Sequence, residues 1–330
     1  MAAPAYRALV RKLWPTQRRF EWRHAELLGE LRALRGAVDQ LRERQEEMLA
    51  GQAELRTRLR RTQALTARVY EQLHAWPELL ADARERAGYE LAYSEPQPLI
   101  SIPIPTYHSP ETLCERTLAS VRAQTYGNWE AIVVGDHCTD DTEARVRALG
   151  DSRIRFVNLP VREVEPADPW EEWAVRGSVP RSTGIELAAG RWIAPLSHDD
   201  AWDSDHLATL LEAARSGRAE LVYSQMRVVD AEAPDRAAFR RCGAWPPRLG
   251  DFAFQASMFH GELRFLRYDR ACALASEPND WNLARRAWEA GVRFEFVDRE
   301  TATLYVYPRV RAIQEAYAAR GLPPSSMASP

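Results

Sequence analysis

Carboxylates follow two apolar runs of this chain, at positions where they could bind a cation. Asp199 and Asp200 stand side by side after one run, and Asp136 directly follows another. Neighbouring carboxylates repel each other and are costly to desolvate, and a divalent cation offsets both effects. Mg²⁺ or Mn²⁺ takes oxygen ligands, commonly one or two carboxylates together with substrate phosphates. The residue types therefore predict a metal-assisted phosphate site. The alternative is that Asp199 and Asp200 cap a helix starting near Asp203.

Short apolar runs alternate with helical segments over residues 99–196. The runs LISIPI (99–104), WEAIVVG (129–135), RIRFVNL (153–159) and RWIAPL (191–196) are typical of buried strands. This alternation predicts an α/β fold with a mainly parallel sheet and helices on both faces. Ligands of such sheets bind outside the carboxyl ends of the strands, so strand-end residues should meet at one edge. These residues are Pro105, Thr106, Tyr107, Asp136, Asp199 and Asp200.

A fourth aspartate, Asp280, precedes an apparent helix at residues 281–290. Its position alone favours a helix N-cap, because Asp is among the preferred residues there. In a group-transfer reaction, a carboxylate near the acceptor hydroxyl could instead promote the loss of its proton. The two roles are compatible with one side chain.

Four segments carry a resemblance to a known family. They are PLISIPIPTY (98–107), SVRAQTYGNWEAIVVGDHCTDDT (120–142), RSTGIELAAGRWIAPLSHDDAW (181–202) and NDWNLARRAWEAGVRFEFVD (279–298). In this order they resemble the inverting family 2 glycosyltransferases, over roughly residues 98–307. The resemblance implies a GT-A-type, Rossmann-like sheet and an enzyme of polysaccharide biosynthesis. Its substrates would be a nucleotide-diphosphosugar donor and a glycan or lipid-linked acceptor.

The resemblance also implies a role for each candidate residue. The donor site would consist of Pro105, Thr106, Tyr107, Asp136, Arg181 and Asp199, with Thr106 and Tyr107 at the base and ribose and Arg181 at the diphosphate. The metal, Mg²⁺ or Mn²⁺, would be held by Asp200 and Asp199. Asp280 would be the general base, and attack opposite the diphosphate would invert the anomeric carbon.

Several positions depart from the commoner family pattern. Gly135 stands where an Asp is frequent, and His137 and Cys138 replace the usual Gly-Ser. Ser197 replaces the first Asp of the three-residue metal motif, and Asn279 stands where an acid often precedes the base. One carboxylate remains at each key position, so the resemblance still implies an active enzyme.

The N-terminal part of the chain has a different pattern. From Leu27 to Trp76, mostly apolar residues recur at alternating steps of four and three. An average step of 3.5 keeps one seam of a helix towards a partner, which is typical of a coiled coil. Gln45 and Gln52 fall on this seam, where paired amides fix the register. We expect a self-associating coil over residues 20–77, or alternatively one long helix folded back onto its own globular domain. Basic residues flanking the seam oppose a homodimer: Arg35, Arg42, Arg44, Arg56 and Arg58.

The chain divides into five predicted segments. They are a basic N-terminal segment (1–19), the coiled-coil helix (20–77), a linker (78–97), the GT-A domain (98–308), and a C-terminal helix with a disordered tail (309–330). In the first segment an apolar helical face ending at Trp14 is flanked by basic residues, and Pro15 ends the pattern. This face predicts peripheral contact with an anionic membrane. The alternative is a frayed terminus.

Composition narrows the class of protein further. The chain contains no run of about 18 apolar residues, so we expect no transmembrane helix. The four cysteines are scattered along the sequence, which indicates free thiols in the cytoplasm. We expect a cytoplasmic protein with peripheral contact at the inner face of the membrane. Residues 1–76 carry 15 Lys/Arg against 9 Asp/Glu, yet glutamates interrupt every basic face, so no nucleic-acid partner is expected. The alternative function is a non-catalytic sugar-nucleotide-binding scaffold that oligomerises through its coil.

Overall fold

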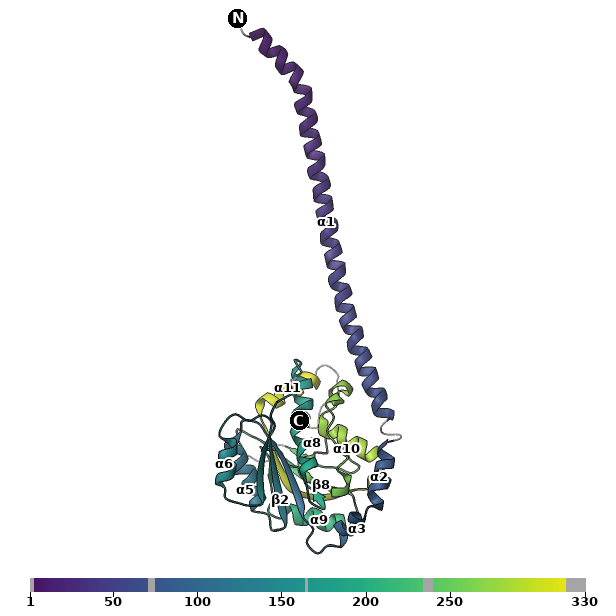
Figure 1. Cartoon of the computed structure of the whole chain (residues 1–330), viewed down its shortest axis with the longest axis vertical. Helices are drawn as coiled ribbons and strands as arrows, with labels where there is room; N and C mark the ends of the chain where they lie inside the picture. Colours follow the sequence, from purple (N-terminus) through teal and green to yellow (C-terminus); the bar gives the residue numbers. More distant parts are fainter. Residues whose placement is uncertain (1–2, 71–74, 164–165, 234–239, 319–330) are drawn as a thin grey trace. The chain divides into compact units, whose positions relative to one another are not determined.

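The computed structural model describes residues 3–70, 75–163, 166–233 and 240–318 (Figure 1). The chain divides into two compact units, Met1–Thr62 and Gln63–Pro330. Residues 319–330, which include the predicted disordered tail, lie outside the described residues. So do the side chains of residues 3–22, on which the predicted membrane face depends.

Helix α1 runs without interruption from Ala3 to Tyr70 (Figure 1). At 1.5 Å per residue, its 68 residues make a rod of about 100 Å. The expectation that Pro15 ends the first helical pattern is wrong, because the helix continues through this residue. The apolar seam is exposed along the first unit. Leu34 and Leu41, for example, each expose 62% of their surface.

The second unit is built on a mixed sheet. Among the described residues it has nine strands in the order β3-β2-β1-β4-β8-β6-β9-β5, with β7 beside β6. Strands β3, β2, β1 and β4 pair in parallel, as predicted. The other half combines antiparallel pairs with the parallel pair β6–β9, so the sheet is less parallel than expected. The strands are β1 (Ile100–Thr106), β2 (Trp129–Gly135), β3 (Ile154–Asn158), β4 (Trp192–Ile193), β5 (Ala201–Trp202), β6 (Leu221–Asp230), β7 (Arg240–Cys242), β8 (Ser257–His260) and β9 (Phe294–Val306).

Helices cover both faces of the sheet, because the central strands are apolar on both sides. Successive residues of β2 enter different core clusters: Val133 belongs to the cluster that includes leucines of α9 (His206–Gly217), and Val134 to the cluster that includes Ile185 of α8 (Ser178–Leu187). On the α9 side, the chain after β1 forms α4 (Pro110–Thr112), a π-helical turn η2 (Leu113–Leu118) and α5 (Ala119–Arg122). The α8 side also holds α10 (Asn279–Glu289). The remaining helices are α6 (Thr142–Ala148), α7 (Pro169–Val175), α11 (Pro308–Ala318) and the 3-10 turns η3 (Phe254–Ala256), η4 (Gly261–Leu263) and η5 (Arg270–Ala275).

Residues 78–97, predicted as a linker, are mostly helical and belong to the second unit. They contain most of α2 (Trp76–Glu85) and all of α3 (Ala87–Ser94). Leu80 and Ala83 of α2 are buried in the α8-side core cluster. Apart from Arg86, which separates the two helices, only the residues around Pro96 and Pro98 are non-helical, in agreement with the extended backbone that proline favours. The linker prediction overlooked the apolar spacing of α2.

Candidate active site

The carboxyl ends of the three outer parallel strands are level with one another. Thr106 of β1 pairs with Gly135 of β2, which pairs with Asn158 of β3. Immediately beyond, the amide of Asp136 donates to the carbonyl of Thr106 at 2.8 Å. The hydroxyl of Thr106 is buried and has no hydrogen-bond partner among the described residues.

The chain after β4 reaches the same edge. Its pairing with β1 continues beyond Ile193, because the amide of Leu196 donates to Pro103 at 3.1 Å. Ser197 therefore lies next to the carboxyl end of β1. The η2 turn then holds the following loop, since Thr117 Oγ1 donates to the Asp200 carbonyl at 2.9 Å. In addition, Arg116 Nη1 donates to the Asp199 carbonyl at 3.1 Å.

Two pairs of side chains lie at one end of this edge: the aromatic pair Tyr107 and His108, and the ion pair Arg162 and Asp136. Tyr107 exposes 38% of its surface and stacks on His108. The guanidinium of Arg162 lies 3.9 Å from the centre of the Tyr107 ring, and its Nε donates to Asp136 Oδ2 at 3.1 Å. The buried Asp136 is thus compensated by an ion pair. Arg162 could not be recognised as a site residue from its sequence, because it lies in a loop after β3 without a recognisable motif.

Close packing explains the glycine at position 135. A Cβ atom there would lie 2.6 Å from Asn158 Oδ1 and 2.8 Å from Phe156 Cζ. The Asn158 amide is fixed, because it accepts from the amide of Cys138 at 2.9 Å and donates to the carbonyl of Cys138 at 2.8 Å. The space for an Asp at this position is therefore taken by the network that shapes the 136–138 turn.

Arg181 lies at the centre of the edge. It is in the first turn of α8, which follows Gly177 in a left-handed conformation (φ 71°). Its guanidinium donates to Ser197 Oγ at 3.1 Å and to Asn279 Oδ1 at 3.3 Å. The guanidinium also lies 5.5 Å from the centre of the Tyr268 ring. One side chain thus connects the loop after β4 with the start of α10.

The two adjacent aspartates have different surroundings. Asp200 is 2% exposed, and its Oδ1 accepts from the amide of Tyr305 at 3.0 Å. Its Oδ2 accepts no hydrogen bond of normal geometry, although the Gln255 amide lies nearby. Burial raises the pKa of Asp200 well above its usual value, the charge of Asp199 adds to this effect, and the Tyr305 amide and Arg181 oppose it. Asp199 is partly exposed.

A divalent cation fits this pair of carboxylates. It would compensate the buried, unpartnered Asp200 oxygen and the repulsion from Asp199. In the parts of the chain described, no group of three His, Cys, Asp or Glu side chains could hold a metal by itself. Diphosphate oxygens and water would therefore have to supply the remaining ligands, as is common for Mg²⁺.

Asp280 lies in the first turn of α10, which begins at Asn279 rather than at the expected residue 281. The residue preceding the helix is Pro278, so the N-cap interpretation of Asp280 is wrong. Its Oδ1 accepts from the amide of Trp281 at 2.7 Å. Burial raises the pKa of Asp280, and the nearby charge of Arg181 opposes that rise. Asp280, Arg181 and Ser197 line one small cavity together with Tyr268.

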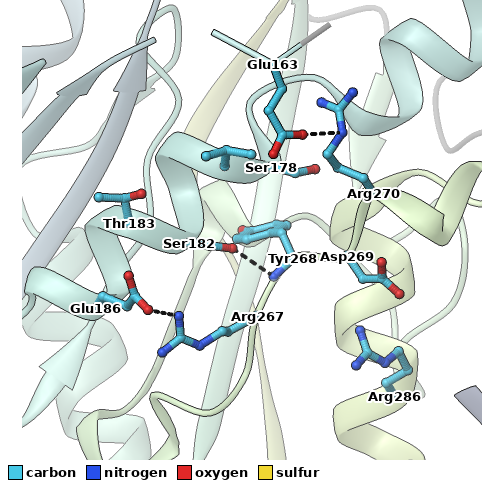
Figure 2. A pocket seen from close by; sticks show the side chains of 11 residues that line it. Glu163, Ser178, Ser182, Thr183, Glu186, Arg267, Tyr268, Asp269, Arg270 and Arg286 are labelled. Carbon is cyan, nitrogen blue, oxygen red and sulfur yellow. Dashed lines mark hydrogen bonds and ion pairs between the residues drawn. The ribbon is translucent and has the colours of Figure 1, made fainter. Parts of the chain in front are cut away.

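A larger polar cavity of about 480 Å³ lies beside this centre (Figure 2). Tyr268 lines both cavities. Figure 2 shows two ion pairs in its wall, Arg267 with Glu186 and Arg270 with Glu163. The hydroxyl-bearing residues Ser178, Ser182 and Thr183 of α8 also face it.

Three other residues have structural roles. His260 is buried, and its two ring nitrogens contact backbone groups of Tyr89 and Glu262 at 2.9 and 3.1 Å. Its pKa is lowered, chiefly by burial. Trp170 and Trp173 pack against each other in a small cluster rather than forming an open platform.

Comparison with known proteins shows a similarity in the first part of the sheet. Residues 101–167 match the family described as Glycosyl transferase family 2. The match agrees with the resemblance carried by the first two of the four segments. The match includes Pro105, Thr106, Tyr107 and Asp136, and it ends before Arg181.

Two bacterial relatives show the same similarity. The Escherichia coli protein WfgD, named a UDP-Glc:alpha-D-GlcNAc-diphosphoundecaprenol beta-1,3-glucosyltransferase, is 29% identical over 132 residues, 40% of this chain and 47% of WfgD. WcaA of Escherichia coli K12, named a putative colanic acid biosynthesis glycosyl transferase, is 33% identical over 116 residues, 34% of this chain and 37% of WcaA. This chain thus spans less than half the length of either relative.

A distant likeness links the structure to the mannosyltransferase PcManGT from Pyrobaculum calidifontis, solved with GDP-Man and Mn²⁺. The likeness has a TM-score of 0.49 and 18% identity, and covers 79% of this chain and 75% of that one. Separately, none of the helices in the described residues is long and apolar enough to cross a membrane.

Proposed function

We propose that this protein is an inverting, metal-assisted glycosyltransferase of polysaccharide biosynthesis. It would move a sugar from a nucleotide-diphosphosugar to a hydroxyl of a glycan or lipid-linked acceptor. The family 2 match supports the reaction class. The contact network of Arg181 is the observation that carries the site assignment, because it joins Ser197, Asn279 and the surroundings of Asp200 and Asp280 at one strand edge.

The nucleotide would occupy the end of the edge that holds Tyr107 and Asp136. The exposed Tyr107 ring can stack on a base, and Asp136 can accept a hydrogen bond from it. His108 and Arg162 both contact this ring, so Arg162 would either cover the bound base or move aside. Pro105 and the unpartnered Thr106 hydroxyl lie between this end and Arg181.

The diphosphate would lie next to Arg181 and the two aspartates. A guanidinium matches phosphate geometry and stabilises the charge that grows on the leaving group. Asp199 and Asp200 would hold Mg²⁺ or Mn²⁺, and such a cation supplies Lewis-acid stabilisation of the leaving diphosphate. Asp199 is the more accessible ligand, and Asp200 offers its free buried oxygen.

Asp280 would take the proton of the attacking acceptor hydroxyl. Burial raises its pKa toward the range in which a carboxylate is an efficient base near neutral pH. Its position beside Arg181 in the small cavity places it next to the proposed diphosphate subsite. Attack from the face opposite the diphosphate inverts the anomeric carbon.

The acceptor would reach Asp280 from the polar cavity beside Tyr268. Its volume of about 480 Å³ can hold one or two sugar rings. Paired guanidinium and carboxylate groups offer both donors and acceptors, which suits a neutral, hydroxyl-rich ligand. WfgD acts, by its name, on a lipid-linked sugar, so a lipid-linked acceptor is part of this proposal. Peripheral membrane contact through residues 1–19 and self-association through residues 20–77 are further parts.

The first experiment is a thermal-shift screen of the purified chain against UDP-, GDP- and dTDP-sugars, with and without Mn²⁺. A donor present at 100 times its Kd stabilises the folded state by about 2.7 kcal/mol, which corresponds to roughly 5–10 °C in Tm. The donor that shifts Tm is then tested for hydrolysis and transfer. Turnover that depends on Mn²⁺ and on Asp280 supports the enzyme. A bound donor without turnover favours the non-catalytic scaffold, and the absence of any donor binding contradicts both.

A further inference from the structure

Helix α1 presents an apolar seam that nothing in its own unit covers. The unit Met1–Thr62 contains only this helix in its described part, and the seam follows the heptad pattern without a break from Leu27 to Leu59. Its d positions are Leu27, Leu34, Leu41, Met48 and Leu55, which expose 57–66% of their surface. Its a positions are Leu31, Val38, Gln45, Gln52 and Leu59. Five leucine or methionine layers on one face of an isolated helix call for a partner helix.

We propose that the partner is a second copy of this chain, and that the two α1 helices pair parallel and in register. The resulting coiled coil extends from about Leu27 to Leu59, so it involves only the first unit of each copy. This inference is independent of the proposed catalytic function.

The two glutamines on the seam select the parallel arrangement. In a parallel, in-register pair each a residue faces itself, so Gln45 meets Gln45 and Gln52 meets Gln52, and the amides can hydrogen-bond each other. In an antiparallel pair that overlaps the whole seam, a residues face d residues. Gln45 would then meet Leu41 of the second copy and Gln52 would meet Leu34. Each amide would be buried against leucine without a partner, at a cost of roughly 1–3 kcal/mol.

The flanking charges select the same arrangement. In a parallel pair each g residue faces the e residue of the next heptad in the other copy. Glu30 (g) then faces Arg35 (e), an attractive pair that occurs twice by symmetry. The remaining basic residues face neutral ones, and no two arginines meet. These pairs are Ala37 with Arg42, Arg44 with Leu49, Gly51 with Arg56, and Arg58 with Gln63.

The antiparallel alternative brings like charges together. There, e faces e and g faces g, and the twofold axis of a full overlap passes near residue 43. Arg42 would lie opposite Arg42 of the second copy and Arg44 opposite Arg44, and these two repulsive pairs offset the two attractive Glu30–Arg58 pairs of the same overlap. The basic flanks therefore oppose only the antiparallel orientation of a homodimer. A parallel pair also joins both catalytic units to the same end of the coil.

The oligomeric state and orientation can be measured on the full-length chain. Light scattering should give twice the monomer mass of 37.6 kDa at micromolar concentration. In a background with Cys114→Ser, the variant Leu34→Cys should form a disulfide-linked dimer on mild oxidation, because Leu34 faces itself. A mixture of Leu34→Cys and Gln52→Cys chains should give no more heterodimer than chance. A monomer, or preferential Leu34→Cys/Gln52→Cys heterodimers, overturns the proposal.

A charge swap provides a test that does not depend on cysteines. Glu30→Arg alone and Arg35→Glu alone should each raise the dimer Kd by roughly 5- to 10-fold, because each replaces two attractive pairs with two repulsive ones. The double variant should return the Kd to within about twofold of wild type. Circular dichroism checks that each variant is helical. No rescue in helical variants contradicts the register, whatever the outcome of the donor-binding screen.

Discussion

Asp136 and Asp200 are both buried carboxylates at the same edge of the sheet, but they are compensated differently. Asp136 is paired with Arg162 at 3.1 Å. Asp200 has no ion pair among the described residues, and one of its oxygens has no hydrogen bond. Its pKa is raised by burial and by Asp199. At the proposed nucleotide end, Asp136 is therefore already compensated by Arg162, whereas at the proposed transfer end, around Asp200 and Asp280, a bound cation would supply the compensation that Asp200 lacks.

Because Asp136 has a cationic partner and Asp200 has none in the described parts of the chain, ligand binding should be coupled to protonation and to a metal at Asp200 rather than at Asp136. A carboxylate that already has a cationic partner stays ionised, and it contributes mainly a hydrogen bond to a ligand. A buried carboxylate without such a partner destabilises the fold when ionised, and its charge is relieved by binding a cation. Substitutions at the two ends should therefore change different measurable quantities.

The largest expected effect is at the transfer end, for Asp280→Asn. Loss of a general base lowers kcat by roughly 10²- to 10⁴-fold, whereas the Tm shift produced by bound donor should persist because Asp280 faces the acceptor. The raised pKa of Asp280 places the acid limb of the wild-type rate above the usual Asp range, and activity falls as pH drops through it. Steady-state kinetics against pH measure both effects. A variant with unchanged kcat would remove Asp280 from the mechanism.

The second prediction separates stability from activity at Asp200. Asp200→Asn should lose Mn²⁺-dependent activity by roughly 10²-fold and yet raise Tm by a few degrees at neutral pH. The folded-state pKa of Asp200 is raised, so its stabilising protonated form is present at low pH and is lost as pH rises through that pKa. The gain in Tm should therefore shrink as the pH is lowered.

Asp199→Asn is the matched control for that variant. It removes a charge of the same sign from the neighbouring, partly exposed side chain. It should weaken Mn²⁺ dependence with a smaller gain in Tm, and it should also lower the pKa of Asp200 by removing the neighbouring charge. Equal gains in Tm at all pH values in both variants would contradict the comparison between the two ends.

A third and smaller effect is expected at the nucleotide end. Asp136→Ala should raise the donor KM roughly 10-fold, because one hydrogen bond to a charged group is lost, with kcat nearly unchanged. Binding calorimetry with the donor and steady-state kinetics check this. Arg162→Ala distinguishes whether Arg162 covers the bound base, in which case affinity falls, or must move aside, in which case affinity rises. A drop in kcat without a change in KM would place Asp136 at the reacting centre instead.

These residues also show which parts of the site can be predicted from the sequence alone. The parallel strands before Asp136 and Asp199 could be predicted, because each is a short apolar run buried on both faces. Since parallel strands end at the same edge of the sheet, the residues that follow them can be predicted to lie close together. Arg162, Arg116 and Thr117 could not be predicted as site residues. They come from a loop and a π-helical turn, whose side-chain directions depend on tertiary packing rather than on a local period.

The mixed half of the sheet was missed for a related reason. Strand β9 is 13 residues long but carries four charged residues, and many of its side chains are partly or fully exposed, so it lacks the apolar run that identified β1. It pairs in parallel with β6, with register shifts near Gln225. The backbone of Tyr305 on this strand provides the hydrogen bond to Asp200. The environment that shifts the Asp200 pKa thus depends on pairing between distant segments.

The smallest effect on activity is expected for Gly135→Ala, which tests whether packing alone excludes a side chain beside Asp136. The new Cβ would lie 2.6 Å from Asn158 Oδ1, whose amide cannot move without breaking both bonds to Cys138. We expect a loss of about 1–3 kcal/mol in unfolding free energy, hence roughly 3–10 °C in Tm, measured by thermal unfolding. Gly127→Ala is the matched control, since a Cβ there meets no atom within 4 Å. If both variants unfold at the wild-type temperature, the 136–138 turn is adaptable, and its close packing does not account for glycine at position 135. If only Gly135→Ala loses stability while its donor KM also rises, the turn that carries Asp136 is held by packing as well as by the Arg162 ion pair.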